Sequence, residues 1–218
     1  NGDFSQIGSE LVTNGDFSTS GTPNTSSWSL GWYSNTNNVI ISDGKLTMTN
    51  SASESDARAY ATNGTSSNNI ITINKFYKLQ YDIVSNNGVT DFKYYSEAGS
   101  FISVPSVEVG SYTIYIRNTS NSLFLFKNGT SNSSISIDNV SVKEVGQNWE
   151  TEGSSSLGLA DFQGRSNVAN INILNTSNSS RVRQSFNYVN GKRYKVSVDV
   201  YLVSGNFRMD CSNSFVSS

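Results

Sequence analysis

The sequence predicts an all-β protein, built as an antiparallel β-sandwich that is followed by a second, incomplete copy of the same domain. Residues 76–83 and 111–117 alternate apolar and polar side chains with the two-residue period of a half-buried strand. Turn residues, mainly Asn, Asp, Ser and Gly, separate such stretches at short and regular spacing. No segment shows a convincing helical period, so we expect strands throughout the chain.

The pentapeptide Asn-Gly-Asp-Phe-Ser occurs twice near the N-terminus, at residues 1–5 and 14–18. Asn-Gly-Asp is typical of turns, and the Phe that follows it can close one edge of a core. The first copy has no set of strands of its own. We therefore interpret residues 1–13 as a leader or linker and residues 14–145 as the first β-sandwich.

The strands of this first domain follow from local patterns. Asp43-Gly44 lies between two β-prone runs and predicts a hairpin over residues 39–49. In residues 76–83, Tyr77, Leu79, Tyr81 and Ile83 share one face and are expected to be buried. Further strands are predicted at residues 58–62, 89–95, 111–117 and 123–127.

The closing strand of the domain, residues 135–145, alternates with one irregularity. Ile135 and Ile137 are two residues apart, as are Val140 and Val142, but the two pairs are out of phase at Asp138-Asn139. One extra residue in an alternating pattern indicates a β-bulge, which keeps both apolar pairs on the buried face.

Residues 146–218 repeat the beginning of the same pattern. Trp149 corresponds to Trp28, and residues 193–200 match residues 76–83 in the positions of Tyr, Lys, Asp and the alternating apolar residues. The counterparts of the later strands are missing. Because half a sandwich leaves a core face and sheet edges uncovered, we expect that further chain, or another chain, completes this domain.

The composition excludes several function classes. The net charge is -2 without a basic patch, which argues against binding to nucleic acid. The chain has no His, which is the commonest general base, and its single Cys211 has no His to activate it. None of the 17 acidic residues lies in a recognisable catalytic motif, so we predict that the protein is not an enzyme. No apolar run is long enough to span a membrane.

Three motifs in this order resemble the carbohydrate-binding modules of families 4, 9 and 22, which share a galactose-binding-like jelly roll. They are Asn14-Gly15-Asp16-Phe17, a Trp in the following loop, and Ile137-Asp138-Asn139-Val140-Ser141-Val142. The Ser- and Asn-rich tandem copies are also similar to domains of bacteriophage tail-fibre and virion-surface proteins. The resemblance covers residues 14–145 well and residues 146–218 in part.

The resemblance implies a structural calcium ion between the N-terminal turn and the closing strand. Asp138 stands at the position of one acidic ligand, whereas Ser18 replaces the other. Backbone carbonyls near Gly15 and Lys45 could contribute, since calcium accepts six to eight oxygen ligands. The alternative is that Asp138 only accepts hydrogen bonds from backbone N–H groups of the bulge.

Sugar recognition needs flat aromatic faces and polar groups that fix the hydroxyls. We assign Trp28 to the core, because Trp149 repeats it in the second copy, whereas Trp32 has no such counterpart. The candidate carbohydrate-binding residues are Trp32, Tyr33, Tyr60 and Tyr95. Tyr94, Tyr115 and Phe101 are further aromatic candidates.

We therefore expect a non-enzymatic structural protein of a virion, of the tail-fibre or surface-appendage type, that can bind host glycans. The expected partners are other virion subunits in a homo-oligomer and a cell-surface glycan, and the expected location is the virion surface or the extracellular space. The alternatives are an accessory carbohydrate-binding module of a secreted bacterial glycanase and a structural adhesin repeat without a ligand.

Overall fold

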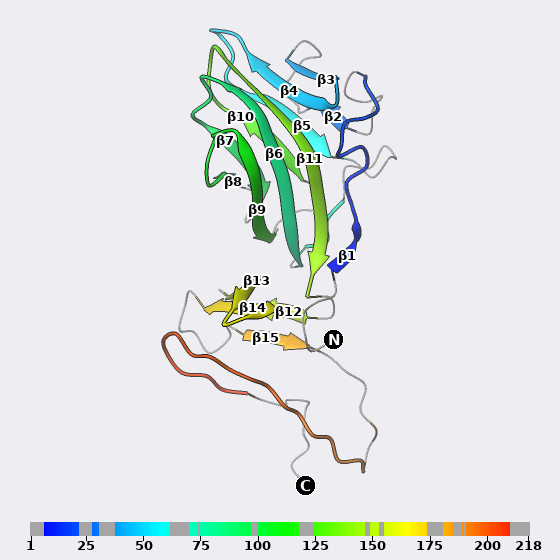
Figure 1. Ribbon diagram of the computed structural model, residues 1–218, viewed down its shortest axis with the longest axis vertical. Helices are drawn as coiled ribbons and strands as arrows, with labels where there is room; N and C mark the ends of the chain where they lie inside the picture. Colours follow the sequence, from blue (N-terminus) through cyan, green and yellow to red (C-terminus); the bar gives the residue numbers. More distant parts are fainter. Residues whose placement is uncertain are drawn as a thin grey trace. The chain divides into compact units, whose positions relative to one another are not determined.

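A computed structural model describes residues 7–21, 28–30, 38–61, 70–73, 75–96, 100–117, 124–146, 149–152, 155–173, 181–184, 189 and 191–209 (Figure 1). The chain divides into two units, Asn1–Ser185 and Phe186–Ser218. The described residues contain strands and turns, and among them there is no helix long and apolar enough to cross a membrane.

The first unit contains a six-stranded antiparallel sheet. Its order is β3-β4-β11-β6-β9, and β1 also pairs with β11. The strands are β1 (Ile7–Glu10), β3 (Val39–Ser42), β4 (Lys45–Asn50), β6 (Phe76–Asn87), β9 (Gly110–Arg117) and β11 (Ser133–Val145). The expected hairpin joins β3 to β4, with Ser42 opposite Lys45 and positive φ angles at Asp43 and Gly44. Two central residues in this conformation form the turn that suits a two-residue hairpin.

A five-stranded antiparallel sheet, in the order β2-β5-β10-β7-β8, faces the first one across the core. Its strands are β2 (Trp28–Leu30), β5 (Ala57–Ala61), β7 (Phe92–Ser96), β8 (Ser100–Ser103) and β10 (Leu125–Asn128). The predicted β-sandwich is thereby confirmed (Figure 1). The sequence patterns missed β2 and β8, which are three and four residues long. Strands this short are too brief to show a period.

The inner faces of the two sheets form one hydrophobic core. Tyr77, Leu79, Tyr81 and Ile83 of β6 are buried, as their alternation predicted. Phe92, Phe124 and Phe126 fill the core from the other sheet, and Trp28 is 0% exposed, which confirms its assignment to the core. Burying side chains of this size contributes about 1.5–3 kcal/mol each, so the sheets are held mainly by these inward residues.

The β-bulge in β11 is present where the sequence placed it. Asp138 pairs with Asp82 of β6, but the next pair is Ser141 with Gln80, so β11 has one extra residue. The extra residue is accommodated at Asn139, whose φ angle is 52°. Asn tolerates this left-handed conformation better than most residues, and a bulge commonly requires it. Val140 and Val142 consequently return to the buried face.

One side of β11 is shared by two strands. β4 pairs with residues 133–137, and β1 pairs with Lys143 and Val145. Between them lies the bulge, where the N–H of Val140 donates to the carbonyl of Gly15 at 2.8 Å. The segment that we interpreted as a leader thus contributes β1 to this sheet, and the turn that follows it fills the gap between β4 and β1.

Beyond β11, the first unit contains two small antiparallel sheets. One pairs β12 (Trp149–Glu152) with β15 (Arg181–Gln184), and the other pairs β13 (Ser155–Phe162) with β14 (Arg165–Ile173). A small apolar cluster of Phe76, Val145 and Leu157 connects these strands to the sandwich, and Trp149 packs against it. Trp149 is therefore half-buried, unlike its counterpart Trp28.

The second unit is described at Val189 and at residues 191–209. No strand is assigned within these residues, and all of them are exposed. The expected strand at residues 193–200 is therefore not formed by the described chain, and Val196, Val198 and Val200 are each about half exposed. The match with β6 remains a similarity of sequence pattern, because no neighbouring strands cover this segment within the described part of the second unit.

Candidate functional site

The outer side of the five-stranded sheet gathers aromatic and charged side chains. Alternation along each strand places them opposite the core, and the register keeps them on one side: Tyr60 is opposite Leu125, Arg58 opposite Lys127, and Lys127 opposite Lys93. On β8, Phe101 is opposite Tyr95. We call this surface the five-stranded outer face; it consists of Asp56, Arg58, Tyr60, Lys93, Tyr95, Phe101, Leu125 and Lys127.

Side chains converge on Phe101 from across this face. The guanidinium carbon of Arg58 lies 4.9 Å from the centre of the Phe101 ring, and the Nζ atom of Lys127 lies 5.1 Å from it. Tyr95 meets the same ring edge-on, at 5.2 Å between centroids. Arg58 and Phe101 come from β5 and β8, which are about 14 Å apart at the usual strand spacing. Their contact shows that long side chains lean together over β10 and β7.

Asp56 holds two cations of this face in place. Asp56 forms ion pairs with Arg58 at 2.6 Å and with Lys127 at 3.3 Å. Burial alone would raise the pKa of the Asp56 carboxyl, but the hydrogen bond and charge of Arg58, together with Lys127, lower the pKa below its ordinary value. Because the pKa of Asp56 is lower in the folded state, the ionised carboxylate stabilises the fold at pH values above its ordinary pKa. This stabilisation is lost as the pH falls through the lowered pKa.

The sequence-predicted binding residues have different positions. Tyr60 and Tyr95 lie on the five-stranded outer face, but Tyr60 is only 7% exposed, so little of its ring is accessible. Tyr95 is half-buried, like Phe101. Trp32 and Tyr33 lie outside the described residues. Of the further aromatic candidates, Tyr94 points into the core and Tyr115 packs against the small apolar cluster at the end of the sandwich.

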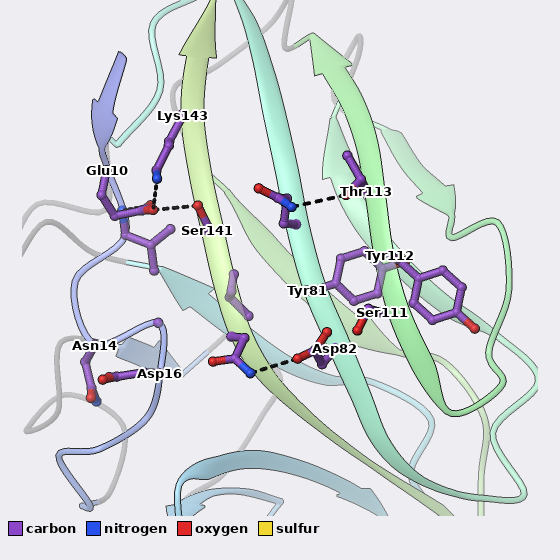
Figure 2. A pocket seen from close by; sticks show the side chains of 15 residues that line it. Glu10, Asn14, Asp16, Tyr81, Asp82, Ser111, Tyr112, Thr113, Ser141 and Lys143 are labelled. Atoms are coloured by element: carbon purple, nitrogen blue, oxygen red, sulfur yellow. Dashed lines mark hydrogen bonds and ion pairs between the residues drawn. The ribbon is translucent and has the colours of Figure 1, made fainter. Parts of the chain in front are cut away.

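A second surface, a groove, lies on the opposite side of the molecule's sandwich, over the outer face of the six-stranded sheet (Figure 2). Its volume is about 710 Å³. Strands β6, β9 and β11 form its floor, and the segment that follows β1 forms one side. The lining is largely polar; it includes Glu10, Asp16, Gln80, Asp82, Ser111, Thr113, Asn139, Ser141 and Lys143.

Glu10 fixes one side of this groove. Its Oε1 atom accepts hydrogen bonds from the N–H groups of Leu11, Val12 and Val142 at 2.8–3.1 Å. Its Oε2 atom accepts from the Ser141 hydroxyl at 2.6 Å. Sequence patterns gave no sign of this role, because it depends on a strand more than a hundred residues away.

Asp138 and Gly15, two of the residues expected to hold calcium, come together at the bulge, where one oxygen atom of each already accepts a hydrogen bond. Oδ1 of Asp138 accepts the N–H of Asn139 at 2.6 Å. The carbonyl of Gly15 accepts the N–H of Val140. Lys45 is the first residue of β4, next to Leu46, which pairs with Ile137 of β11.

The residue that replaces the second acidic ligand is engaged as well. The hydroxyl of Ser18 donates to Asp16 at 3.0 Å. Among the described residues, no group of three or more His, Cys, Asp or Glu could hold a metal ion. The residues present therefore fit the bulge-capping role of Asp138 better than a calcium site.

This difference can be measured by thermal unfolding in the presence of a chelator. If Asp138 only stabilises the bulge, chelation followed by addition of millimolar calcium leaves the melting temperature unchanged. A bound calcium ion would instead raise the melting temperature with calcium concentration, because a ligand that binds only the folded state stabilises it by mass action. Magnesium at the same concentration serves as the control for ionic strength.

The chain is similar in structure to several solved proteins. No family model and no curated protein matches the chain. One similar solved structure is a family 4 carbohydrate-binding module (CBM4), with 11% identity, a TM-score of 0.36, and coverage of 61% of this chain and 99% of that one. Another is the CBM22-1 xylan-binding domain of Xyn10C from Paenibacillus barcinonensis, with 13% identity, a TM-score of 0.38, and coverage of 65% and 97%. The tandem CBM22-1–CBM22-2 domain of the same protein has 12% identity, a TM-score of 0.41, and coverage of 72% and 57%.

Proposed function

We propose that this chain is a non-enzymatic glycan-binding protein and that the five-stranded outer face is its binding surface. The observation that carries the proposal is the convergence of Arg58, Lys127 and Tyr95, from three neighbouring strands, on Phe101 of a fourth. These contacts hold aromatic rings and hydrogen-bond donors in a fixed arrangement before any ligand arrives. Such preorganisation reduces the entropy that binding would otherwise cost.

The chemistry of this surface suits a saccharide. Half-buried Tyr95 and Phe101 offer apolar ring surface to the C–H groups of a pyranose. Arg58, Lys93 and Lys127 are donors for hydroxyl oxygens, and Asp56 is an acceptor. The alternation of both kinds of group along neighbouring strands is what a polyhydroxyl ligand requires, since it has donors and acceptors on every ring.

The test is a glycan array probed with the wild type and with the variants Phe101→Ala and Tyr95→Ala. Each variant is expected to bind its glycan about two- to tenfold more weakly, because an aromatic contact is worth about 0.5–1.5 kcal/mol. Ile40→Ala, an exposed apolar residue on the other sheet, is the control and should bind as the wild type does. Circular dichroism checks that each variant is folded.

Equal binding by all three variants would reject the five-stranded outer face as the site. The same array tests the other predicted stacking residues: if Trp32→Ala loses binding while Phe101→Ala keeps it, the loop around Trp32 and Tyr33 is the site instead.

As the setting of this activity, we propose the surface of a virion or another extracellular appendage, in which copies of the chain assemble with one another. The Ser- and Asn-rich composition and the tandem pattern support this proposal. An accessory module of a secreted glycanase is the alternative, and an adhesin repeat without a ligand is a third. The array separates them: an appendage binds bacterial surface polysaccharides, an accessory module binds plant polysaccharides such as xylan, and a ligand-free repeat binds neither.

A further inference from the structure

We propose that the groove over the six-stranded sheet is a second saccharide site, separate from the five-stranded outer face, and that it takes sugar units without negative charge. The inference concerns a different surface from the proposed function and does not depend on it. The groove is built from three strands and one loop. In Figure 2, Asp82 and Ser111 lie close together on its floor and Glu10 and Ser141 meet at its edge, whereas Asp16 points toward Asn14.

The floor of the groove is held in place by hydrogen bonds between neighbouring strands. The Gln80 amide on β6 donates to the Thr113 hydroxyl on β9 at 3.2 Å. The Asn139 amide at the bulge of β11 donates to the Asp82 carboxylate on β6 at 2.7 Å. Each bond fixes the rotamer of a side chain that would otherwise be mobile, so these groups do not have to be ordered by the ligand.

Each of these fixed side chains keeps one hydrogen-bonding atom without a partner within the described chain. These atoms are Oε1 of Gln80, Oδ1 of Asp82 and Oδ1 of Asn139, and the hydroxyl of Ser111 is similarly unpaired. They are acceptors, apart from the hydroxyl, which both donates and accepts. A row of acceptors across three strands matches the hydroxyl or amine hydrogens of a sugar ring.

The charge of the groove limits which sugars fit. Glu10, Asp16 and Asp82 are acidic, whereas Lys143 is the basic side chain among the residues that line the groove. Lys143 also lies 3.9 Å from Glu10, which offsets its charge. The acidic side chains would repel a carboxylated or sulfated sugar bound in the groove, whereas they would not repel a neutral or amine-bearing sugar. The β-bulge in β11 directs the Asn139 side chain toward Asp82, to which it donates a hydrogen bond.

The size of the groove is also suitable. Its volume of about 710 Å³ lies within the usual range of about 300–1,000 Å³ for small-ligand sites. It lies on the opposite side of the sandwich from the five-stranded outer face, so the two surfaces can be occupied at the same time. Two weak sites on one chain can hold a branched or dense glycan more firmly than either alone.

The experiment is a titration of the full chain, followed by NMR amide shifts, with three tetrasaccharides: the amine-bearing glucosamine tetramer, the neutral N-acetylglucosamine tetramer and the anionic galacturonate tetramer. The first two are expected to shift the signals of Gln80, Ser111 and Asn139. The galacturonate tetramer is expected to bind at this groove at least about tenfold more weakly, because of repulsion by the acidic residues.

The variant Asp82→Asn removes one charge but can still accept the hydrogen bond from Asn139. This variant is expected to bind the glucosamine tetramer about tenfold more weakly, while its affinity for the neutral tetramer changes by less than about threefold. Asp43→Asn, the same change in the exposed turn between β3 and β4, should leave the affinities for both tetramers unchanged. Phe101→Ala should also leave the shifts of Gln80 and Asn139 intact.

Shifts confined to β5, β7, β8 and β10 would overturn the inference and leave the proposed function standing. Equal binding of the anionic tetramer at Gln80 and Asn139, or an equal effect of Asp82→Asn and Asp43→Asn, would overturn it as well. Shifts at the groove without any at the five-stranded outer face would support the groove and count against the proposed function.

Discussion

Replacing Gly15 by alanine is expected to destabilise the sandwich by about 3 kcal/mol or more, a large part of the roughly 5–15 kcal/mol that keeps an ordinary domain folded. A Cβ atom on Gly15 would overlap the carbonyl oxygen of Val140 and lie 3.1 Å from its carbonyl carbon. Both atoms belong to the backbone of β11, which is fixed on its other side by β6. No rotation of a side chain can relieve such an overlap.

The substitution also weakens a hydrogen bond. Gly15 accepts the N–H of Val140 at 2.8 Å, in the gap between β4 and β1, and a backbone that moves to make room for the methyl group lengthens this bond. A buried N–H group that loses its partner costs about 1–3 kcal/mol. The measurement is urea denaturation followed by tryptophan fluorescence and circular dichroism.

Gly44→Ala is the matched control. A Cβ atom on Gly44 meets nothing within 4 Å, but its φ of 68° is unfavourable for alanine, so we expect a loss of about 1 kcal/mol from backbone strain alone. If Gly15→Ala costs no more than Gly44→Ala, then the close approach of residue 15 to the bulge does not contribute to stability as argued.

Trp28→Ala is expected to cost about 3–5 kcal/mol, as large aromatic truncations in a core do. The Trp28 ring is fully buried and packs on Phe17 at 5.2 Å between centroids. Its Nε1 atom donates to the carbonyl of Asn14 at 3.2 Å. The substitution thus opens a cavity and also releases the turn that holds the N-terminal segment against β11.

Two variants separate these effects. Trp28→Phe keeps most of the packing on Phe17 and removes the hydrogen bond, so we expect a smaller loss of about 1–2 kcal/mol. Trp149→Ala removes the corresponding residue of the second copy, which is half-buried, and should cost clearly less than Trp28→Ala. Equal losses for Trp28→Ala and Trp149→Ala would contradict the assignment of Trp28 alone to the main core.

The features that the sequence predicted correctly are those encoded within a few residues. The hairpin at Asp43-Gly44, the buried face of β6 and the bulge at Asp138-Asn139 each follow from local alternation or turn chemistry. The sequence did not reveal that β1 belongs to the first sandwich. Ile7–Glu10 is short and mostly exposed, and its pairing is visible only once β11 is placed.

The candidate surfaces were predictable only in part. Tyr60 and Tyr95, two of the candidates named from the sequence, lie on the side of the sheet that faces away from the core, but alternation does not tell which strands are neighbours. The convergence on Phe101 depends on the order β5-β10-β7-β8, in which chain order and spatial order differ. The groove over the six-stranded sheet likewise joins Glu10 to Ser141 and Gln80 to Thr113, pairs that lie 131 and 33 residues apart.

The pairing of β1 and Gly15 with the end of β11 has a consequence for how the protein folds. These contacts join the first residues of the sandwich to its last strand, so they close a loop of almost the whole domain. Contacts of such high sequence separation form late and slow the overall folding rate. During synthesis, β1 leaves the ribosome before the other strands of this sheet and must wait for β11, so it is the last of them to join the sheet.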